Sequence, residues 1–470
     1  MSKLQPIPSY SDPVQWAEET FGNCRLGDIR RTTRVVEYAA RQAANPGGST
    51  YAVCQGDYAA SNGAYRLLRN PSIDPKALEE APFELTAKRC QQYPGDVLAI
   101  QDTTTLSYSH SVTGQLGDLG GGRGFVVHSA LAVCPDTKNI LGLLDQTRWV
   151  RPEMRSGKRA RKRRAYAEKE SYKWEAASRR IRERVGTTDN IITVCDREGD
   201  IYEYLDYLNR EGQRFVVRAT YDRRLATAAG NLWDYMSEQP IIGHHEVEIQ
   251  QRGPQRATLG RPARPGRSAE RRRVEVRVGH VELLKPDSTA RATGVYVVYV
   301  RDPVLVKGRW RMEWMLLTSE PVTTMQQAEV VIGHYRLRWL IEDYHKVWKT
   351  GCRIEQRRSP DADNLERLAV ITAQVAVRVL ALRYLAMQGP ERPCTEALST
   401  DEWQCLYASV HRRAPFPESP PSLTWAMREI AKLGGWQDTK RNGAIGWITL
   451  WRGWRYFQER VTGWRLARLS

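Results

Sequence analysis

Three acidic residues that lie far apart in the chain have the types and settings that phosphoryl-transfer chemistry requires. Asp102 closely follows the apolar run Val97–Ile100, and Asp196 directly follows the largely apolar run Ile191–Cys195. Glu342 lies in a segment whose spacing predicts a helix. Carboxylate oxygens are the ligands that Mg²⁺ and Mn²⁺ prefer, and two such ions can activate an attacking oxygen and stabilise a leaving one. The three carboxylates therefore predict a two-metal site.

The segment around Glu342 predicts one long amphipathic helix. At about 100° per residue, five polar side chains share a sector of about 80°; they are Tyr335, Arg338, Glu342, Lys346 and Lys349. An ordinary helix with ion pairs four residues apart would show the same pattern. The two upstream aspartates favour the catalytic interpretation, in which the cations hold neighbouring phosphates. Asp343 lies about 100° away from Glu342 and is the weaker ligand candidate.

Short segments rich in β-branched residues predict the sheet that must position the aspartates. The predicted strands are Val97–Ile100, Phe125–Val133, Ile140–Val150, Ile191–Cys195 and Arg214–Arg218. Helices are predicted over about 166–185, between the third and fourth strands, and around Tyr202–Leu205, between the fourth and fifth. This order of elements is the one expected of a mixed α/β, RNase H-like domain.

The remaining segments predict an insertion and two helical flanks. Residues 220–320 predict a β-rich insertion in a catalytic domain of residues 76–385, with strands at Arg271–Val278, Val295–Val300 and Trp314–Leu317. Residues 1–75 predict helices that carry Arg30 and Arg66, either as a solvated basic face or as a DNA-end-binding domain. Residues 386–470 are helical and end in an aromatic stripe, either core or a partner surface; it comprises Trp447, Trp451, Trp454, Phe457, Val461 and Trp464.

The bulk composition favours a polyanionic partner. The chain has 470 residues and a formal net charge of +17, from 71 basic and 54 acidic residues. The eight cysteines form no CxxC pair and no HExxH is present, which predicts reduced thiols and no zinc ribbon or redox motif. No apolar run approaches the roughly 20 residues of a membrane span. Two Arg-rich segments, 155–164 and 252–273, fit either DNA affinity or solvated loops.

Several collinear segments resemble the Tn-five-like DDE transposases of the insertion-sequence-four family. The four-residue signature of this family matches Tyr335, Arg338, Glu342 and Lys349 with its spacing. The other matching segments are Leu26–Thr32, Gly63–Arg66, Asp102–Thr104, Val194–Glu198, Leu316–Pro321 and Ala431–Gly435. The run at 155–164 departs from the pattern, because the family is acidic there and this chain is strongly basic.

The resemblance implies roles for single residues. Asp102, Asp196 and Glu342 would be the catalytic, metal-binding triad, with two Mg²⁺ ions per site and Mn²⁺ able to substitute. Tyr335, Arg338 and Lys349 would grip phosphates near the cleaved end. Trp314 would stack on a flipped-out base, although strand packing alone also explains a tryptophan there. Arg218 also matches a DNA-contacting arginine of the family. From their positions on the predicted helices, Trp339, Lys346, Arg30 and Arg66 are further predicted DNA contacts.

The resemblance also implies a reaction and its partners. The expected activity is cut-and-paste transposition: hydrolysis at the transposon ends, hairpin formation and opening, and transfer of the 3′-hydroxyl ends into target DNA. The partners would be double-stranded DNA and a second copy of the chain in a synaptic complex, in the bacterial cytoplasm at the nucleoid. The C-terminal aromatic stripe would be the dimer contact. The alternatives are a metal-dependent nuclease that does not join DNA and a catalytically silent DNA-binding relative.

Overall fold

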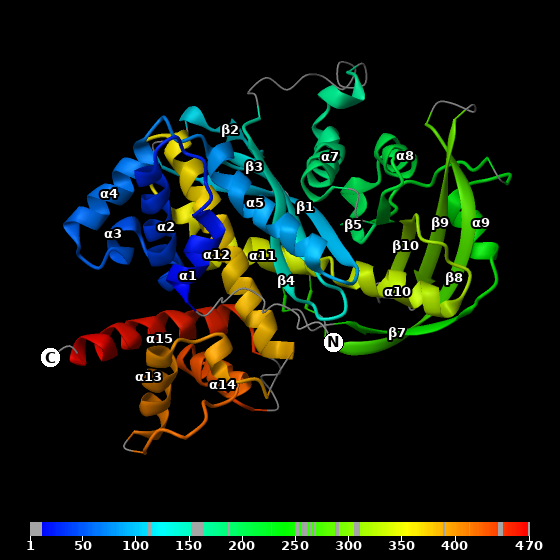
Figure 1. Cartoon of the computed structure of the whole chain (residues 1–470). Helices are drawn as coiled ribbons and strands as arrows, with labels where there is room; N and C mark the ends of the chain where they lie inside the picture. The colour runs from blue at the N-terminus through cyan, green and yellow to red at the C-terminus, as the bar shows by residue number, and fades with distance from the viewer. Residues whose placement is uncertain are drawn as a thin grey trace.

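The computed structural model describes residues 12–468 except 111–113, 152–163, 187–188, 227, 250–252, 255–256, 258–261, 264, 267, 287–290, 305–310, 389–390, 413 and 440–444. Within these residues one ten-stranded sheet runs in the order β2 (Gly117–Asp118), β3 (Arg123–Val133), β1 (Val97–Tyr108), β5 (Ile191–Cys195), β6 (Arg214–Arg218), β10 (Glu313–Thr318), β9 (Ala292–Arg301), β8 (Glu270–Leu284) and β7 (Gly243–Ile249), with β4 (Ile140–Trp149) paired to β3. Figure 1 shows blue N-terminal helices at one end of this sheet, its green strands at the other, and orange-to-red C-terminal helices beneath the blue ones.

The first half of the sheet has the predicted RNase H-like topology. Strand β3 is antiparallel to β1 and β4 is antiparallel to β3, whereas β5 is parallel to β1 and β6 to β5. Helices α7 (Lys173–Val185) and α8 (Tyr202–Arg210) cross between the parallel strands. Two boundaries differ most from the sequence prediction. Strand β1 continues to Tyr108, so Asp102 lies inside it, and the helix predicted from 166 begins at Lys173 after two short 3₁₀ turns.

The segment that contains Glu342 is not one helix, so that prediction was wrong. Helix α10 (Met325–Arg336) ends before Leu337, and α11 (Trp339–Lys346) begins after Arg338. The N–H groups of Leu337, Arg338 and Leu340 bond to carbonyls three residues earlier, which tightens the chain into a turn between the helices. A π-helical turn, Val347–Gly351, then follows α11. Tyr335 and Glu342 therefore belong to different helices.

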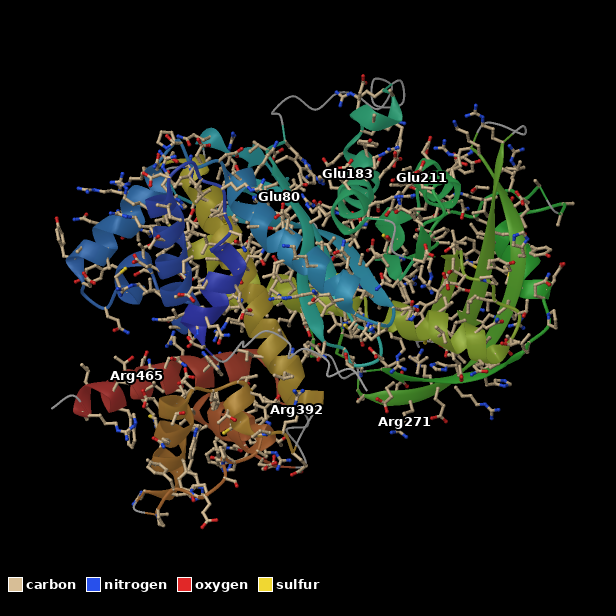
Figure 2. All side chains as sticks on the ribbon, viewed as in Figure 1. Glu80, Glu183, Glu211, Arg271, Arg392 and Arg465 are labelled. Atoms are coloured by element: carbon tan, nitrogen blue, oxygen red, sulfur yellow. The ribbon has the colours of Figure 1, made fainter. Side chains whose placement is uncertain are left out.

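The insertion continues the catalytic sheet. Strand β10 pairs with β6 on one side and with β9 on the other, and α9 (Leu232–Glu238) packs against β8. All three predicted strands are confirmed. The Arg-rich segment 252–273, expected to be a loop, contains the start of β8 at Glu270, and Arg272 is buried there between Glu270 and Asp302. Arg271, labelled at the outer edge of the insertion in Figure 2, pairs with Glu248.

Two sets of helices lie together at one end of the catalytic sheet (Figure 1). The N-terminal set is α1 (Pro13–Phe21), α2 (Ile29–Ala44), α3 (Thr50–Val53), α4 (Tyr58–Arg69) and α5 (Pro75–Gln92), and the C-terminal set is α13 (Thr400–His411), α14 (Leu423–Leu433) and α15 (Trp447–Ala467). Aspartate side chains cap α1, α2, α4 and α5 by accepting backbone N–H groups. Since no boundary between these sets and the sheet has been tested, the division at 75 and 385 stays a prediction.

The aromatic stripe of α15 packs inside this chain. Phe457 and Val461 are almost fully buried, and the half-buried Trp454 and Trp464 pack against the same core. Arg465, labelled in Figure 2, pairs with Asp401 on α13. The side chains of Trp447 and Trp451 lie outside the described residues. The part of the stripe that is described therefore packs in the core of its own chain, and its predicted role as the dimer contact stays a prediction.

Helix α12 (Ala362–Gln388) joins the parts of the fold. Its stretch Ala362–Leu385 is long and apolar enough to cross a membrane by length and composition alone, but 89% of its most apolar window is buried inside the protein. Two of its arginines donate hydrogen bonds to the N-terminal helices: Arg367 to the carbonyl of Leu68, and Arg378 to that of Ala43. These contacts make α12 a core helix to which the N-terminal helices are docked.

The basic run at 155–164 cannot be placed in this fold. Residues 155–163 lie outside the described residues, and Arg164 stands at the edge of the described part. Its role stays an open prediction.

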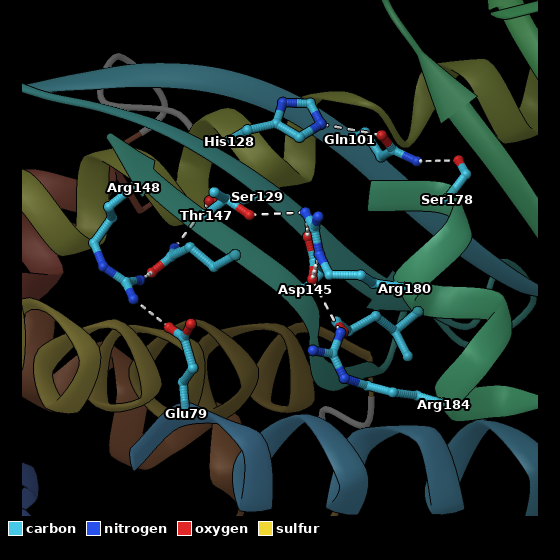
Figure 3. Close-up of polar contacts among 12 residues, drawn as sticks. Glu79, Gln101, His128, Ser129, Asp145, Thr147, Arg148, Ser178, Arg180 and Arg184 are labelled. Carbon is cyan, nitrogen blue, oxygen red and sulfur yellow. Dashed lines mark hydrogen bonds and ion pairs between the residues drawn. The ribbon is translucent and has the colours of Figure 1, made fainter. Parts of the chain in front are cut away.

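Buried ion pairs join the helices to the catalytic sheet (Figure 3). Asp145 on β4 is almost fully buried and accepts from Arg180 at 2.9 and 2.8 Å and from Arg184 at 2.9 Å, both on α7. Arg148, two residues beyond Gln146 on the same strand, pairs with Glu79 of α5 and with Glu366 of α12. The charges are compensated only when all these elements are in place, so the pairs fix their relative positions.

We expect Asp145→Leu to lower the free energy of unfolding by roughly 3 kcal/mol, because it leaves two partly buried guanidinium groups without their shared carboxylate. The measurement is urea unfolding followed by tryptophan fluorescence. Arg210→Gln is the control, since it breaks an exposed pair with Asp206 and should change stability by less than about 1 kcal/mol. Equal, small effects of both substitutions would contradict the structural role of Asp145.

Candidate active site

The pairing of β1 with β5 sets Asp102 beside Asp196. The two strands are parallel and place Gln101 opposite Cys195, so the next residue on each chain segment is an aspartate. Side chains alternate between the two faces of a sheet. Asp102 therefore points to the same face as Ile100, which packs in one core with residues of α11. By the same alternation Asp196 points to this face.

Backbone N–H groups hold both carboxylates. Thr103 N–H donates to Asp102 Oδ1 at 2.8 Å, and Glu198 N–H donates to Asp196 Oδ1 at 2.8 Å. The second bond caps the 3₁₀ turn Arg197–Gly199 that leaves the end of β5. Each aspartate thus keeps its second oxygen available on the face that α11 covers.

Glu342 and Arg338 form an ion pair at this face. Glu342 lies in the first turn of α11, and its Oε1 is 2.5 Å from Nη2 of Arg338. Burial by itself lowers the pKa of Arg338, but the hydrogen bond to Glu342 and the negative charges nearby, Asp102 included, raise it overall. The guanidinium group therefore remains charged and compensates the carboxylates around it.

The carboxyl group of Asp102 is strongly affected by its surroundings. Burial and then the neighbouring charge of Asp196 raise its pKa, Arg338 lowers it, and the net result is a pKa of about 7. Glu342 contributes a smaller increase. These interactions show that the three predicted carboxylates lie close enough to act on one another, and that their negative charges are not fully compensated.

His345 is a site residue that the sequence analysis missed. Its Nδ1 lies 3.8 Å from Asp102 Oδ2, and its Nε2 is buried without a hydrogen-bond partner among the described residues. Burial, and then the charges of Lys349 and Arg338, together lower the pKa of His345 to about 3, so the imidazole is neutral. The spacing of three residues from Glu342 on one helix was the signal that could have found it.

Tyr335, Arg218 and Trp314 form a second group next to the carboxylates. Tyr335 is buried at the end of α10, and its ring lies edge-on to the half-buried indole of Trp314 with centroids 5.2 Å apart. Burial raises the pKa of Tyr335, whereas the charge of Arg218 and a hydrogen bond to it lower that pKa. Arg218 also donates to the carbonyl of Glu313 at 2.9 Å. In this structure Trp314 thus packs on its neighbours, as the simpler interpretation predicted.

The other predicted contacts on α11 are spread around it. Trp339 is 58% exposed and its ring lies 4.9 Å from the guanidinium carbon of Arg338. Lys346 is exposed and pairs with Asp343 at 3.3 Å. Lys349 lies in the π-helical turn, with Nζ 3.9 Å from Glu355 Oε1. Asp343 also accepts from Arg383 and Tyr384 of α12, which directs its carboxylate away from the aspartates.

Arg30 and Arg66 are not part of this group. Both side chains are exposed on the N-terminal helices, Arg30 in the first turn of α2 and Arg66 in α4. Figure 1 shows α2 and α4 at the opposite end of the molecule from α10 and the insertion. These arginines can therefore serve only a separate binding surface of the same chain.

Comparisons with known proteins agree with this geometry. Residues 13–73 match a family model described as transposase DNA-binding, and residues 151–377 match one described as a transposase DDE domain. These matches support a DNA-cleaving transposase, and they include Asp196, Glu342, Arg30 and Arg66. Asp102 lies between the two matched segments.

One solved structure was also found to be similar. It is a cryo-EM structure of the piggyBac transposase synaptic complex with hairpin DNA, at 8% sequence identity and a TM-score of 0.41, over 98% of this chain and 82% of that one.

The carboxylates of the DDE domain fit divalent cations by donor type, since DDE domains generally use such metals and Mg²⁺ prefers oxygen ligands. Among the side chains that the structure describes, however, no three His, Cys, Asp or Glu residues are drawn together as a metal-binding cluster. Glu342 is paired with Arg338 instead. It must leave this arginine before it can share a cation with Asp102 and Asp196.

We expect Asp102→Asn to stabilise the metal-free protein by about 2 kcal/mol at pH 8. Because the pKa of Asp102 in the folded protein lies above its usual value near 4, the folded state takes up a proton between pH 4 and 7. Stability from this group is present at low pH and is lost as the pH rises through that window. The measurement is urea unfolding of both proteins in EDTA at pH 4.5 and pH 8. A variant no more stable than the wild type at pH 8 would contradict the raised pKa.

Arg338→Gln should have the opposite effect on the metal-free protein. Without the guanidinium the three carboxylates repel one another, so we expect the free energy of unfolding to fall by about 1–2 kcal/mol. The expected decrease is no larger than this because Glu342 is partly exposed and solvent screens its charge. The same repulsion should make Mg²⁺ raise the melting temperature more than in the wild type. Thermal unfolding with and without Mg²⁺ measures both effects. Arg392→Gln, which removes the exposed pair with Glu396, is the control and should match the wild type.

Proposed function

We propose that the protein is a cut-and-paste DNA transposase of the insertion-sequence-four type, with Asp102, Asp196 and Glu342 as its catalytic residues. The observation that carries the proposal is the parallel register of β1 and β5, which sets the two aspartates side by side on the face that α11 covers with Glu342. The raised pKa of Asp102, due to burial and then to Asp196, supports a site made to hold cations.

The three carboxylates would hold two Mg²⁺ ions, with Mn²⁺ able to substitute, and bound ions of this kind activate an attacking oxygen and stabilise a leaving oxygen. Asp102 must give up its proton for this role, which its pKa of about 7 permits at neutral pH. Arg338, once released from Glu342, can hold a phosphate oxygen next to the carboxylates. Tyr335 and Lys349 would bind the neighbouring phosphates, with Lys346 and Trp339 further along α11.

The proposed reaction has four steps. A water cuts one strand at the transposon end, and the freed 3′-hydroxyl attacks the opposite strand to close a hairpin. A second water opens the hairpin, and the 3′-hydroxyls then attack target DNA. Every step exchanges one phosphodiester bond for another or hydrolyses it, so no external energy source is needed. Trp314, beside Arg218, would stack on a base flipped out of the hairpin.

The proposed assembly is a homodimer on two transposon ends in the bacterial cytoplasm, at the nucleoid. The N-terminal helices would bind the terminal repeats through Arg30 and Arg66, whose exposed positions suit phosphate contacts. Since Phe457 and Val461 are buried in their own chain, the dimer contact on α15 would use its outer side, where Tyr456 and Leu466 are exposed.

The test compares two adjacent carboxylates on α11. Purified protein is incubated with Mg²⁺ and linear DNA that carries the element's own terminal repeats. We expect hairpins and joined products from the wild type. In Glu342→Gln the rate at which these products form should fall at least about 10³-fold, as when a group that acts in the transition state is removed. Asp343→Asn is the matched control and should remain active, because its carboxylate binds Arg383 and Tyr384 on α12.

Pre-cut ends separate the alternative functions. A transposase joins pre-cut 3′-hydroxyl ends to target DNA, and a nuclease cuts intact ends but leaves pre-cut ends unjoined. A catalytically silent relative binds the ends and does neither. Cleavage that is lost in both α11 variants, or in neither, would contradict the assignment of Glu342.

A further inference from the structure

A buried polar network lies on the face of the sheet opposite Asp102. His128 on β3 is fully buried, and its Nδ1 is 3.0 Å from Thr103 Oγ1 while its Nε2 is 3.1 Å from Gln101 Oε1. Gln101 Nε2 in turn donates to Ser178 Oγ on α7 at 3.0 Å and to Tyr204 OH on α8 at 3.3 Å. Figure 3 shows the bonds from His128 to Gln101 and from Gln101 to Ser178.

The orientation of the Gln101 amide sets the direction of the hydrogen bonds at His128. The amide nitrogen of Gln101 donates to two hydroxyl groups, so its carbonyl oxygen faces His128 and can only accept. Nε2 of His128 therefore carries the proton, and Nδ1 accepts from the hydroxyl of Thr103. Burial, and then the charges of Lys173 and Arg180, lower the pKa of His128 well below its usual value. The ring is thus neutral, with both nitrogens paired.

The network grips β1 on both sides of Asp102. Gln101 and Thr103 are the residues immediately before and after it, and because side chains alternate along a strand they point to the face opposite its carboxylate. Thr103 is also the residue whose N–H donates to Asp102 Oδ1. In the register of β1 with β3, Thr103 lies directly opposite His128. A single imidazole therefore connects the two residues that flank the aspartate.

We propose that Gln101, Thr103 and His128 are positioning residues that set the backbone of β1 at Asp102 and thereby the affinity of the site for a divalent cation. This proposal rests on the proposed function, in which Asp102 is a metal ligand. Residues that orient a metal ligand act on affinity because coordination tolerates only small displacements of the ligand atoms. The network acts through the backbone of β1, and none of its side chains touches DNA or metal.

The central test substitution is Thr103→Val. Valine keeps the branched shape and the N–H that binds Asp102, but it removes the hydroxyl that donates to His128. Thr103→Ser keeps that hydroxyl and is the conservative rescue. Thr318→Val is the control, because Thr318 is a buried residue of β10, three strands away from β1, whose hydroxyl donates to the carbonyl of Phe215 and accepts from the N–H of Glu320.

The readout is binding of Mn²⁺ alone to the DNA-free protein, measured by electron paramagnetic resonance of free Mn²⁺. We expect Thr103→Val to weaken Mn²⁺ binding roughly tenfold, which is the smaller end of the effect on metal affinity found for residues that orient metal ligands. Thr103→Ser and Thr318→Val should bind like the wild type. Circular dichroism and the melting temperature show that each variant is folded, and the Mg²⁺ dependence of end cleavage should shift in the same order.

The outcomes separate this proposal from the one on which it rests. If Thr103→Val binds Mn²⁺ within twofold of the wild type while Asp102→Asn binds far more weakly, Asp102 is a ligand and the network does not position it. If the wild type binds Mn²⁺ no better than Asp102→Asn, the proposed metal site itself is wrong and both proposals fail. A loss of binding in Thr318→Val equal to that in Thr103→Val would assign the effect to general destabilisation.

Discussion

The parallel pairing of β1 with β5 is the constraint on which the rest of the site depends. It turns two aspartates that are 94 positions apart in sequence into neighbours, with no contact between their side chains needed to hold them together. On the other side of β1 lies the antiparallel strand β3, which in turn pairs with β4, and α11 brings the third carboxylate to the same face. A slip of β5 by one residue would turn Asp196 to the opposite face of the sheet.

Charge compensation is the second organising feature. Three carboxylates gathered in a partly buried site repel one another, and in this structure the buried guanidinium of Arg338 offsets part of that repulsion. On the α7 side of the sheet, Asp145 with Arg180 and Arg184 fixes the helix against β4 through fully paired charges. The two arrangements differ in that Asp145 keeps its partners, whereas Glu342 has to exchange one positive partner for another if it binds a cation.

Much of this architecture could be predicted from sequence, because its signals are local. The strands β5 and β6 were predicted at their observed limits, since both are short runs of β-branched residues bounded by polar turns. The break between α10 and α11 could not be predicted, because no proline or glycine marks it and only tertiary packing favours the tighter turn. His128 and Gln101 gave no signal either, because their partners come from β1, α7 and α8 and meet only in the folded chain. The role of the Asp102, Asp196 and Glu342 side chains remains a prediction.

The continuity of β6, β10 and β9 has a mechanical consequence. Trp314 lies opposite Val300, and Leu316 lies opposite Arg218, in one uninterrupted hydrogen-bonded ladder that leads back to Asp196. Because backbone hydrogen bonds hold Trp314 within this ladder, its backbone cannot move on a hinge. The sheet therefore fixes the distance between the backbone of Trp314 and the carboxylates. One residue added within β10, next to Trp314, would change this distance and turn the indole to the other side of the sheet.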